Sequence, residues 1–137
     1  MQSFFWHVLS SPAIYRTLIE SVQSAVDDGT IPASGNLSWA EAQSLTYFQA
    51  CLKEAMRVRP AVGLNITRVV PQEGAELDGH VFPGGTRVAI NGWVLHRDRI
   101  TFGDDAEAYR PERWLESKDK ERRLDRYMFQ VSAIPNG

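Results

Sequence analysis

The sequence contains a single cysteine, Cys51, among its 137 residues. One thiol cannot form an internal disulfide, which fits a reducing compartment and fits chance equally well. Long hydrophobic runs are also missing, because His7 and Ser10 interrupt the first apolar stretch well short of the ~20 residues that span a bilayer. The sequence therefore predicts no transmembrane segment and no signal peptide.

Neither sign of charge is in large excess, since 15 Lys and Arg stand against 17 Asp and Glu, for a formal net charge of -2. Such a balance creates no field that would attract a phosphate backbone, and it argues against nucleic-acid binding. Hydrophobic residues make up 43% of the chain, enough to bury a modest core at this length. With no internal repeat, the composition indicates one globular unit.

Helical spacing dominates the first part of the chain. Apolar residues at 4, 5, 8 and 9 share one helix face with no capping residue before them, which predicts the last turns of a longer helix. Ser11 and Pro12 then supply an N-cap and an N1 proline, and apolar residues at helical spacing predict a helix over 12–27. The turn formers of residues 30–37 predict a connecting loop.

A second helix is predicted to begin at Ser38, which forms a capping box with Glu41. Its apolar stripe continues to about Val58. Pro60 disfavours helical geometry at the residue before it, so the helix is expected to end there.

Short extended runs follow this helix. β-branched residues predict a strand over 65–70, and Asp78-Gly79 predicts a two-residue hairpin turn between strands at 75–77 and 80–82. Another strand is predicted over 86–91.

Regular patterning fades beyond Trp93. Residues 98–126 are dense in charges and turn formers, and nearly every position from Glu116 to Arg126 is charged. This part is predicted to be a solvated irregular coil.

Three motifs stand in a fixed order along the chain. Lys53-Glu54-Ala55-Met56-Arg57 lies late in the second helix, His96-Arg97-Asp98 follows the strands, and Tyr109-Arg110-Pro111-Glu112-Arg113-Trp114 lies in the predicted coil. Together they resemble the cytochrome P-450 family of haem-thiolate monooxygenases over nearly the whole chain. The resemblance implies that residues 1–137 are a partial domain from the C-terminal half of that fold, from the end of the I helix through the meander.

The fold class that the resemblance implies is α+β. Two main helices, J-like and K-like, are expected to precede short β-strands with a hairpin and an irregular meander coil. The whole is expected to be part of a larger, mainly α fold.

Glu54, Arg57 and Arg113 match a structural triad of this family. A Glu and an Arg three residues apart share one helix face, where carboxylate and guanidinium can meet. Taken alone, such a pair is usually an exposed one worth roughly a few tenths of a kcal/mol, and it is the accompanying motifs that favour the triad. In the family, the triad holds the haem-proximal core together and performs no chemistry.

The resemblance also implies a haem cofactor and further binding residues. Arg68 is expected to face a haem propionate, a role that suits a bidentate donor, although an arginine facing water at a strand edge is the alternative. The expected substrate-pocket residues are Val62, Gly63, Leu64 and Asn65.

Neither a catalytic residue nor an iron ligand is identified in the sequence. The resemblance implies that the family's cysteine loop would follow Gln130, but residues 131–137 contain no cysteine. Val131-Ser132 can be encoded by the sequence of a 5′ splice site. Residues 131–137 are therefore hypothesised to be translated intron. Cys51 is expected to be a small core residue of its helix. A lone His96 is expected to be structural rather than a metal ligand.

Two hypotheses about function follow. In the first, the chain is a fragment of a haem-dependent monooxygenase that oxidises a small apolar molecule with dioxygen and electrons from a cytochrome reductase. Without the thiolate and the I-helix proton relay, the chain alone is expected to be inactive and not to bind haem stably. In the second, it is a non-catalytic binding or interaction piece. The motifs are most similar to those of filamentous-fungal members of the family, which points to secondary metabolism. An intact fungal homologue is expected at the endoplasmic reticulum membrane. The fragment alone is expected to be cytoplasmic or unstable.

Overall fold

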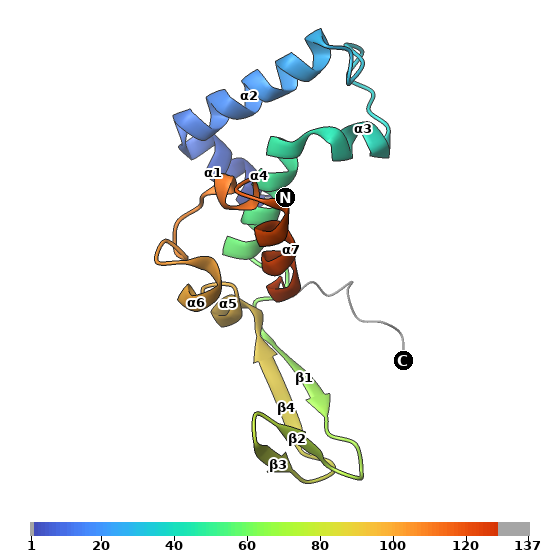
Figure 1. Ribbon diagram of the computed structural model, residues 1–137, viewed down its shortest axis with the longest axis vertical. Helices are drawn as coiled ribbons and strands as arrows, with labels where there is room; N and C mark the ends of the chain where they lie inside the picture. The colour runs from blue at the N-terminus through green and yellow to red at the C-terminus, as the bar shows by residue number, and fades with distance from the viewer. Residues whose placement is uncertain (1, 129–137) are drawn as a thin grey trace.

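The computed structural model describes residues 2–128, which form a helical body from which a long two-stranded ribbon extends (Figure 1). The hypothesised translated intron at residues 131–137 lies outside this part. In chain order the elements are α1 (Gln2–Ser10), α2 (Pro12–Asp27), α3 (Trp39–Ser44), α4 (Thr46–Val58), β1 (Asn65–Val69), β2 (Ala75–Leu77), β3 (His80–Phe82), β4 (Arg87–Asn91), α5 (Gly92–Leu95), α6 (Arg99–Phe102), the 3-10 turn η1 (Pro111–Trp114) and α7 (Lys118–Tyr127). The α+β class predicted from the sequence is confirmed.

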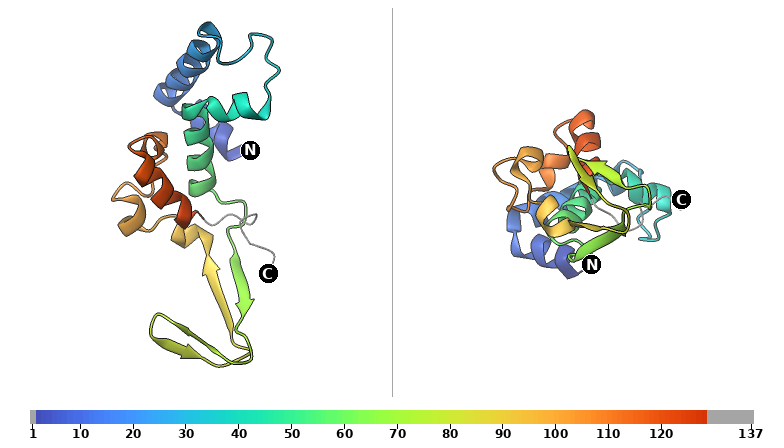
Figure 2. Two further views of the ribbon diagram at one scale, coloured as in Figure 1. Left: turned by 45° about the vertical axis from the view of Figure 1, so that its right-hand side comes forward. Right: turned by 90° about the horizontal axis from the view of Figure 1, so that it is seen from below.

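Helix α4 lies at the centre of the helical body and packs against α1, α2 and η1 (Figure 2). Its residues enter two apolar clusters on different sides. The first cluster, shared with α1 and α2, contains Phe4, Val8, Leu18, Tyr47, Cys51 and Ala55. The second, shared with the segment after the strands, contains Ala50, Phe102, Ala106, Trp114, Leu124 and Met128. Because α4 lies between these two clusters, the polar side chains that the helix places between the clusters are shielded from water.

The predicted helix over 12–27 is confirmed to the residue. Ser11 has an extended backbone and Pro12 occupies the first turn, where its missing N–H leaves no hydrogen bond unmade. Capping by Ser38 and Glu41 is also confirmed, with both reciprocal hydrogen bonds formed.

The prediction of one continuous second helix was wrong at Leu45, where the chain breaks into α3 and α4. Leu45 has a ψ of 79°, outside the helical region, and its side chain is buried with Ala25 and Ile31. The side-chain amide of Gln49 donates to the carbonyl of Ala42 at 2.8 Å, which satisfies one acceptor that the break releases. Burial of Leu45 in this third cluster therefore outweighs the continuity that helical periodicity predicts.

The four predicted strands and the hairpin at Asp78-Gly79 are confirmed, while the pairing of the first strand with the last was not predicted. β1 pairs antiparallel with β4 from Asn65 opposite Asn91 to Val69 opposite Arg87, and this pair forms the ribbon. β2 pairs with β3 at its far end (Figure 1). Asp78 and Gly79 between them both have positive φ, 50° and 73°, as a two-residue turn of this hand requires.

The prediction of irregular coil was wrong for Lys118–Tyr127, which forms helix α7. Ser117 caps the helix through its hydroxyl, and Leu124 is fully buried in the second cluster. Lys53 of α4 reaches Glu121 and Asp125 of α7 at 2.9 and 2.8 Å, so the charges pair across two neighbouring helices. Dense charge therefore marks the outer faces of an amphipathic helix here. Two further short helices, α5 and α6, also lie where regular structure was not predicted.

None of the helices between residues 2 and 128 combines the length and apolar character that crossing a membrane requires.

Candidate functional site

The carboxylate of Glu54, on α4, is the centre of a buried polar network. It is 0% exposed and accepts hydrogen bonds from five donors. Arg57 donates through Nε and Nη2 at 2.9 and 2.8 Å, in fork geometry. Arg113 donates through Nε at 3.0 Å, the backbone N–H of Arg110 at 2.9 Å and the indole N–H of Trp114 at 2.9 Å. Three of these donors come from the segment of η1, so one carboxylate joins α4 to that segment.

Arg57 uses all five of its N–H groups. Besides the two bonds to Glu54, Nη1 donates to the carbonyls of His96 and Ala106 at 2.7 and 2.6 Å, and Nη2 donates to that of Ala108 at 2.9 Å. Such full satisfaction is what a buried guanidinium requires. Arg57 thereby holds the chain from residue 96 to residue 108 against α4.

Arg113 is satisfied in the same way. Its Nη1 donates to the carbonyl of Phe102 and to Oδ1 of Asp105, at 2.7 and 3.1 Å, and its Nη2 donates to the carbonyls of Asp105 and Ala108. Asp105 also pairs with Arg110. The second arginine therefore fastens the turn of residues 102–108 to η1.

The charge on Glu54 is fixed by its neighbours. Burial alone would raise the pKa of this carboxyl, but the hydrogen bond from Arg57 and the charges of Arg57 and Arg113 outweigh burial and hold the pKa below its ordinary value. The carboxylate is therefore ionised at neutral pH, opposite two guanidinium groups.

The structure thus brings Glu54, Arg57 and Arg113 together, all three with fully buried side chains. Trp114, Asp105 and the backbone of Arg110 also belong to this network and were not predicted from the sequence. Trp114 belongs to the same motif as Arg113, and a tryptophan that is buried needs a partner for its N–H. That requirement is the signal that could have identified it.

His96 and Cys51 lie in structural settings. The ring Nδ1 of His96 lies 3.2 Å from the carbonyl of Arg57, and burial lowers the pKa of this imidazole. Cys51 is fully buried in the first cluster, and burial raises the pKa of its thiol to about 12. A thiol that stays protonated is a poor metal ligand.

The expected cofactor and substrate residues lie on and before β1, away from the buried network. Arg68 is exposed, and its Nη1 donates to the neighbouring carbonyl of Thr67 at 3.1 Å. It borders an apolar hollow of about 230 Å³ on the ribbon, lined by Ile66, Arg68, Leu77, Val88, Ala89 and Ile90. In the segment of Val62 to Asn65, Leu64 is 78% exposed, and Asn65 accepts a hydrogen bond from the side chain of Asn91 at 2.8 Å.

The described residues fit only part of what a haem needs. A guanidinium beside an apolar hollow suits a propionate at the edge of a flat hydrophobic ring. Among residues 2–128, however, no group of three or more potential metal-binding side chains comes together. Cys51 is buried and the pKa of its thiol is raised to about 12, so this cysteine does not fit the role of a thiolate ligand.

Comparison with known proteins agrees with this geometry. The sequence profile of the family described as cytochrome P-450 matches residues 1–129. The chain is 42% identical over 124 residues to the cytochrome P-450 monooxygenase cicH of Emericella nidulans, covering 90% of this chain and 24% of that protein. It is 40% identical over 119 residues to pisatin demethylase of Fusarium vanettenii, covering 87% of this chain and 22% of that protein. A cytochrome P-450 monooxygenase of Aspergillus terreus is 36% identical over 138 aligned positions, covering 97% of this chain and 27% of that protein.

The buried network joins the motifs of residues 53–57 and 109–114, and the family profile and the relatives cover that same stretch. The chain belongs to the cytochrome P-450 family. It spans about a quarter of the length of the curated relatives described above.

Proposed function

We propose that this chain is the structural core segment of a haem-dependent monooxygenase, in which Glu54, Arg57 and Arg113 form a lock. The lock joins α4 to η1 and to the segment of residues 96–108 between the strands and η1. The whole protein's proposed reaction inserts one atom of dioxygen into a small apolar molecule, while the other atom leaves as water. The two electrons come from a cytochrome reductase, and two protons are consumed. This chain's own residues take no part in bond making.

The proposal rests on the observation that every hydrogen-bond donor of the two arginines in the lock has an acceptor. Each arginine uses all five N–H donors, and both are fully buried with Glu54. An ordinary surface pair would be exposed, with most donors facing water. Here the three charged groups form an internal joint between segments far apart in sequence.

Haem, when bound, would supply the oxygen chemistry, and this chain would supply contacts at its edge. Arg68 is proposed to donate to a propionate. Val62, Gly63, Leu64 and Asn65 are proposed to line the substrate pocket, with the exposed Leu64 offering apolar surface. An intact fungal protein with this segment is proposed to act at the endoplasmic reticulum membrane with its reductase.

A chimera tests the proposal. The matching stretch of this chain replaces its counterpart in pisatin demethylase, to which it is 40% identical. The chimera is expected to bind haem through a thiolate, seen as the thiolate-type band of the reduced carbon monoxide complex, and to demethylate pisatin. Introducing Glu54→Ala should abolish both properties, whereas Glu76→Ala, at an exposed strand position, should leave them unchanged. A correctly folded chimera that lacks the thiolate band would contradict the proposal.

A further inference from the structure

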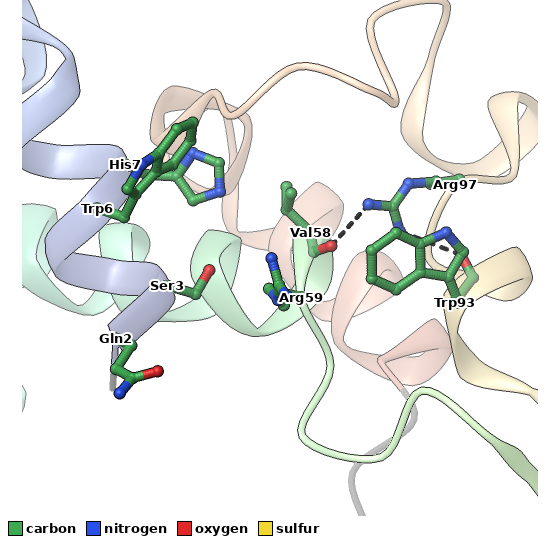
Figure 3. A pocket seen from close by; sticks show the side chains of 8 residues that line it. All are labelled: Gln2, Ser3, Trp6, His7, Val58, Arg59, Trp93 and Arg97. Atoms are coloured by element: carbon green, nitrogen blue, oxygen red, sulfur yellow. Dashed lines mark hydrogen bonds between the residues drawn. The ribbon is translucent and has the colours of Figure 1, made fainter.

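Arg97 is bound to the C-terminal end of α4. Its Nη2 donates to the carbonyl of Val58 at 2.7 Å, the last residue of that helix (Figure 3). Helix carbonyls in this turn lack an intrahelical partner and carry the negative end of the helix dipole, so a cation is favoured there. The Arg97 side chain is only 14% exposed, which strengthens this contact.

The same guanidinium holds the ring of Trp93. It lies 3.8 Å from the ring centroid, and Nη1 donates to the Trp93 carbonyl at 3.3 Å (Figure 3). Nε pairs with Glu107 at 3.0 Å, which fixes the orientation of the planar group. Trp93 remains 43% exposed, so its orientation depends on Arg97 more than on a surrounding core.

Trp93 in turn lies against the chain that leaves α4. A side-chain atom added at Gly63 would lie 3.9 Å from Cε3 of Trp93, and one added at Gly92 would lie 3.3 Å from the carbonyl of Val62. The backbone of Val62 and Gly63 thus runs along Gly92 and Trp93. Two residues further on, the hydrogen bond between Asn91 and Asn65 holds the start of β1.

We propose that Arg97 and Trp93 are positioning residues for substrate binding. They form a latch that fixes Val62 to Asn65 relative to the end of α4. Because Arg97 holds the helix end and Trp93 holds the segment that follows, a change in either moves the pocket wall without touching the substrate. The inference rests on the proposed function, since it assumes that this segment lines the pocket.

A double-mutant cycle in the haem-loaded chimera tests the latch. Gly63→Ala is combined with Trp93→Ala, and KM and kcat for pisatin are measured together with haem content. Residues in contact influence each other's effects, so the change in KM caused by Gly63→Ala is expected to differ at least about twofold between the parent chimera and the Trp93→Ala variant. As a control, Gly63→Ala is combined with Trp39→Ala, whose side chain is 80% exposed, and these two effects should be independent.

Arg97 is tested by conservative rescue. Arg97→Ala is expected to raise KM several-fold. Arg97→Lys should reverse less than half of that increase, because an ammonium keeps the charge but not the planar fork.

If Trp93→Ala lowers haem content, the double-mutant cycle is repeated with Trp93→Phe, which keeps an aromatic ring. Independent effects of residues 63 and 93 on KM in haem-loaded protein overturn the latch. A parent chimera without the thiolate band overturns the proposed function and, with it, the latch.

Discussion

The indole nitrogen of Trp114 donates to Oε2 of Glu54 at 2.9 Å, across 60 residues of sequence, and both side chains are buried. The motif of residues 111–114 thus contributes two side chains to one carboxylate, a guanidinium on Oε1 and an indole on Oε2. A tryptophan at this position therefore acts as a hydrogen-bond donor as well as a core residue.

Trp114→Phe is expected to lower the free energy of unfolding by about 1.5–3 kcal/mol, because it removes a hydrogen bond to a charged group and leaves most of the apolar ring in place. Thermal unfolding of the chimera followed by circular dichroism measures the change. Trp39→Phe is the matched control, since Trp39 is 80% exposed and should give no measurable shift. Equal shifts for both variants would contradict the role assigned to the indole N–H.

Glu54→Ala is expected to cost more, about 3–5 kcal/mol, because it leaves two buried guanidinium groups without their shared carboxylate. Losses of this size approach the whole stability of many domains, so haem incorporation should fail as well. Haem content and the unfolding midpoint of the chimera measure both effects. A Glu54→Ala variant that folds and loads haem like its parent would show that the lock does not hold the segments together.

Local signals in the sequence predicted most of the fold. Pro12 and the Ser38 capping box set helix starts, and Asp78-Gly79 set the hairpin, because each acts through its own backbone. The break at Leu45 and helix α7 were not predicted, because both depend on partners distant in sequence. Leu45 leaves the helix to pack with Ile31, and α7 forms where Leu124 can be buried.

In the candidate site, too, the sequence predicted what depends on local spacing and missed what depends on partners distant in sequence. The spacing of Glu54 and Arg57 placed both on one helix face, but no local signal showed that the backbone N–H of Arg110 or the carbonyls of residues 96, 106 and 108 complete the network. Those partners follow from the path of the chain after the ribbon. Helical or strand periodicity does not encode that path.

Acid is expected to destabilise the lock. The pKa of Glu54 is lower in the folded state than its ordinary value of 4.5, so its stabilising contribution is fully present above that value and is lost as pH falls from there through the lower pKa of the folded state. Acid unfolding of the chimera between about pH 6 and pH 2.5 should therefore be shallower in Glu54→Gln. Glu121→Gln is the control, because Lys53 also lowers the pKa of Glu121 but that pair is partly exposed, and its slope should change less.

Cys51 is expected to resist alkylation in the folded protein. Burial raises the pKa of its thiol to about 12, and the side chain is 0% exposed, so both the thiolate and access to it are lacking. Iodoacetamide at about pH 8 should label the Cys51 peptide only after unfolding in urea, as read by mass spectrometry. A Ser34→Cys variant in the exposed loop should be labelled without urea. Rapid labelling of native Cys51 would place it outside the core.

Arg68→Ala tests the proposed contact to the haem edge. Arg68 lies opposite Val88 on the ribbon and borders the apolar hollow, whereas Arg87 lies on the opposite face, since neighbouring positions of a strand alternate. Both arginines are exposed, so neither substitution should disturb the core. In the chimera, Arg68→Ala should speed the loss of haem to an acceptor protein severalfold and change the KM for pisatin less. Arg87→Ala should retain haem like the parent, and equal rates of loss in the two variants would refute the assignment of Arg68.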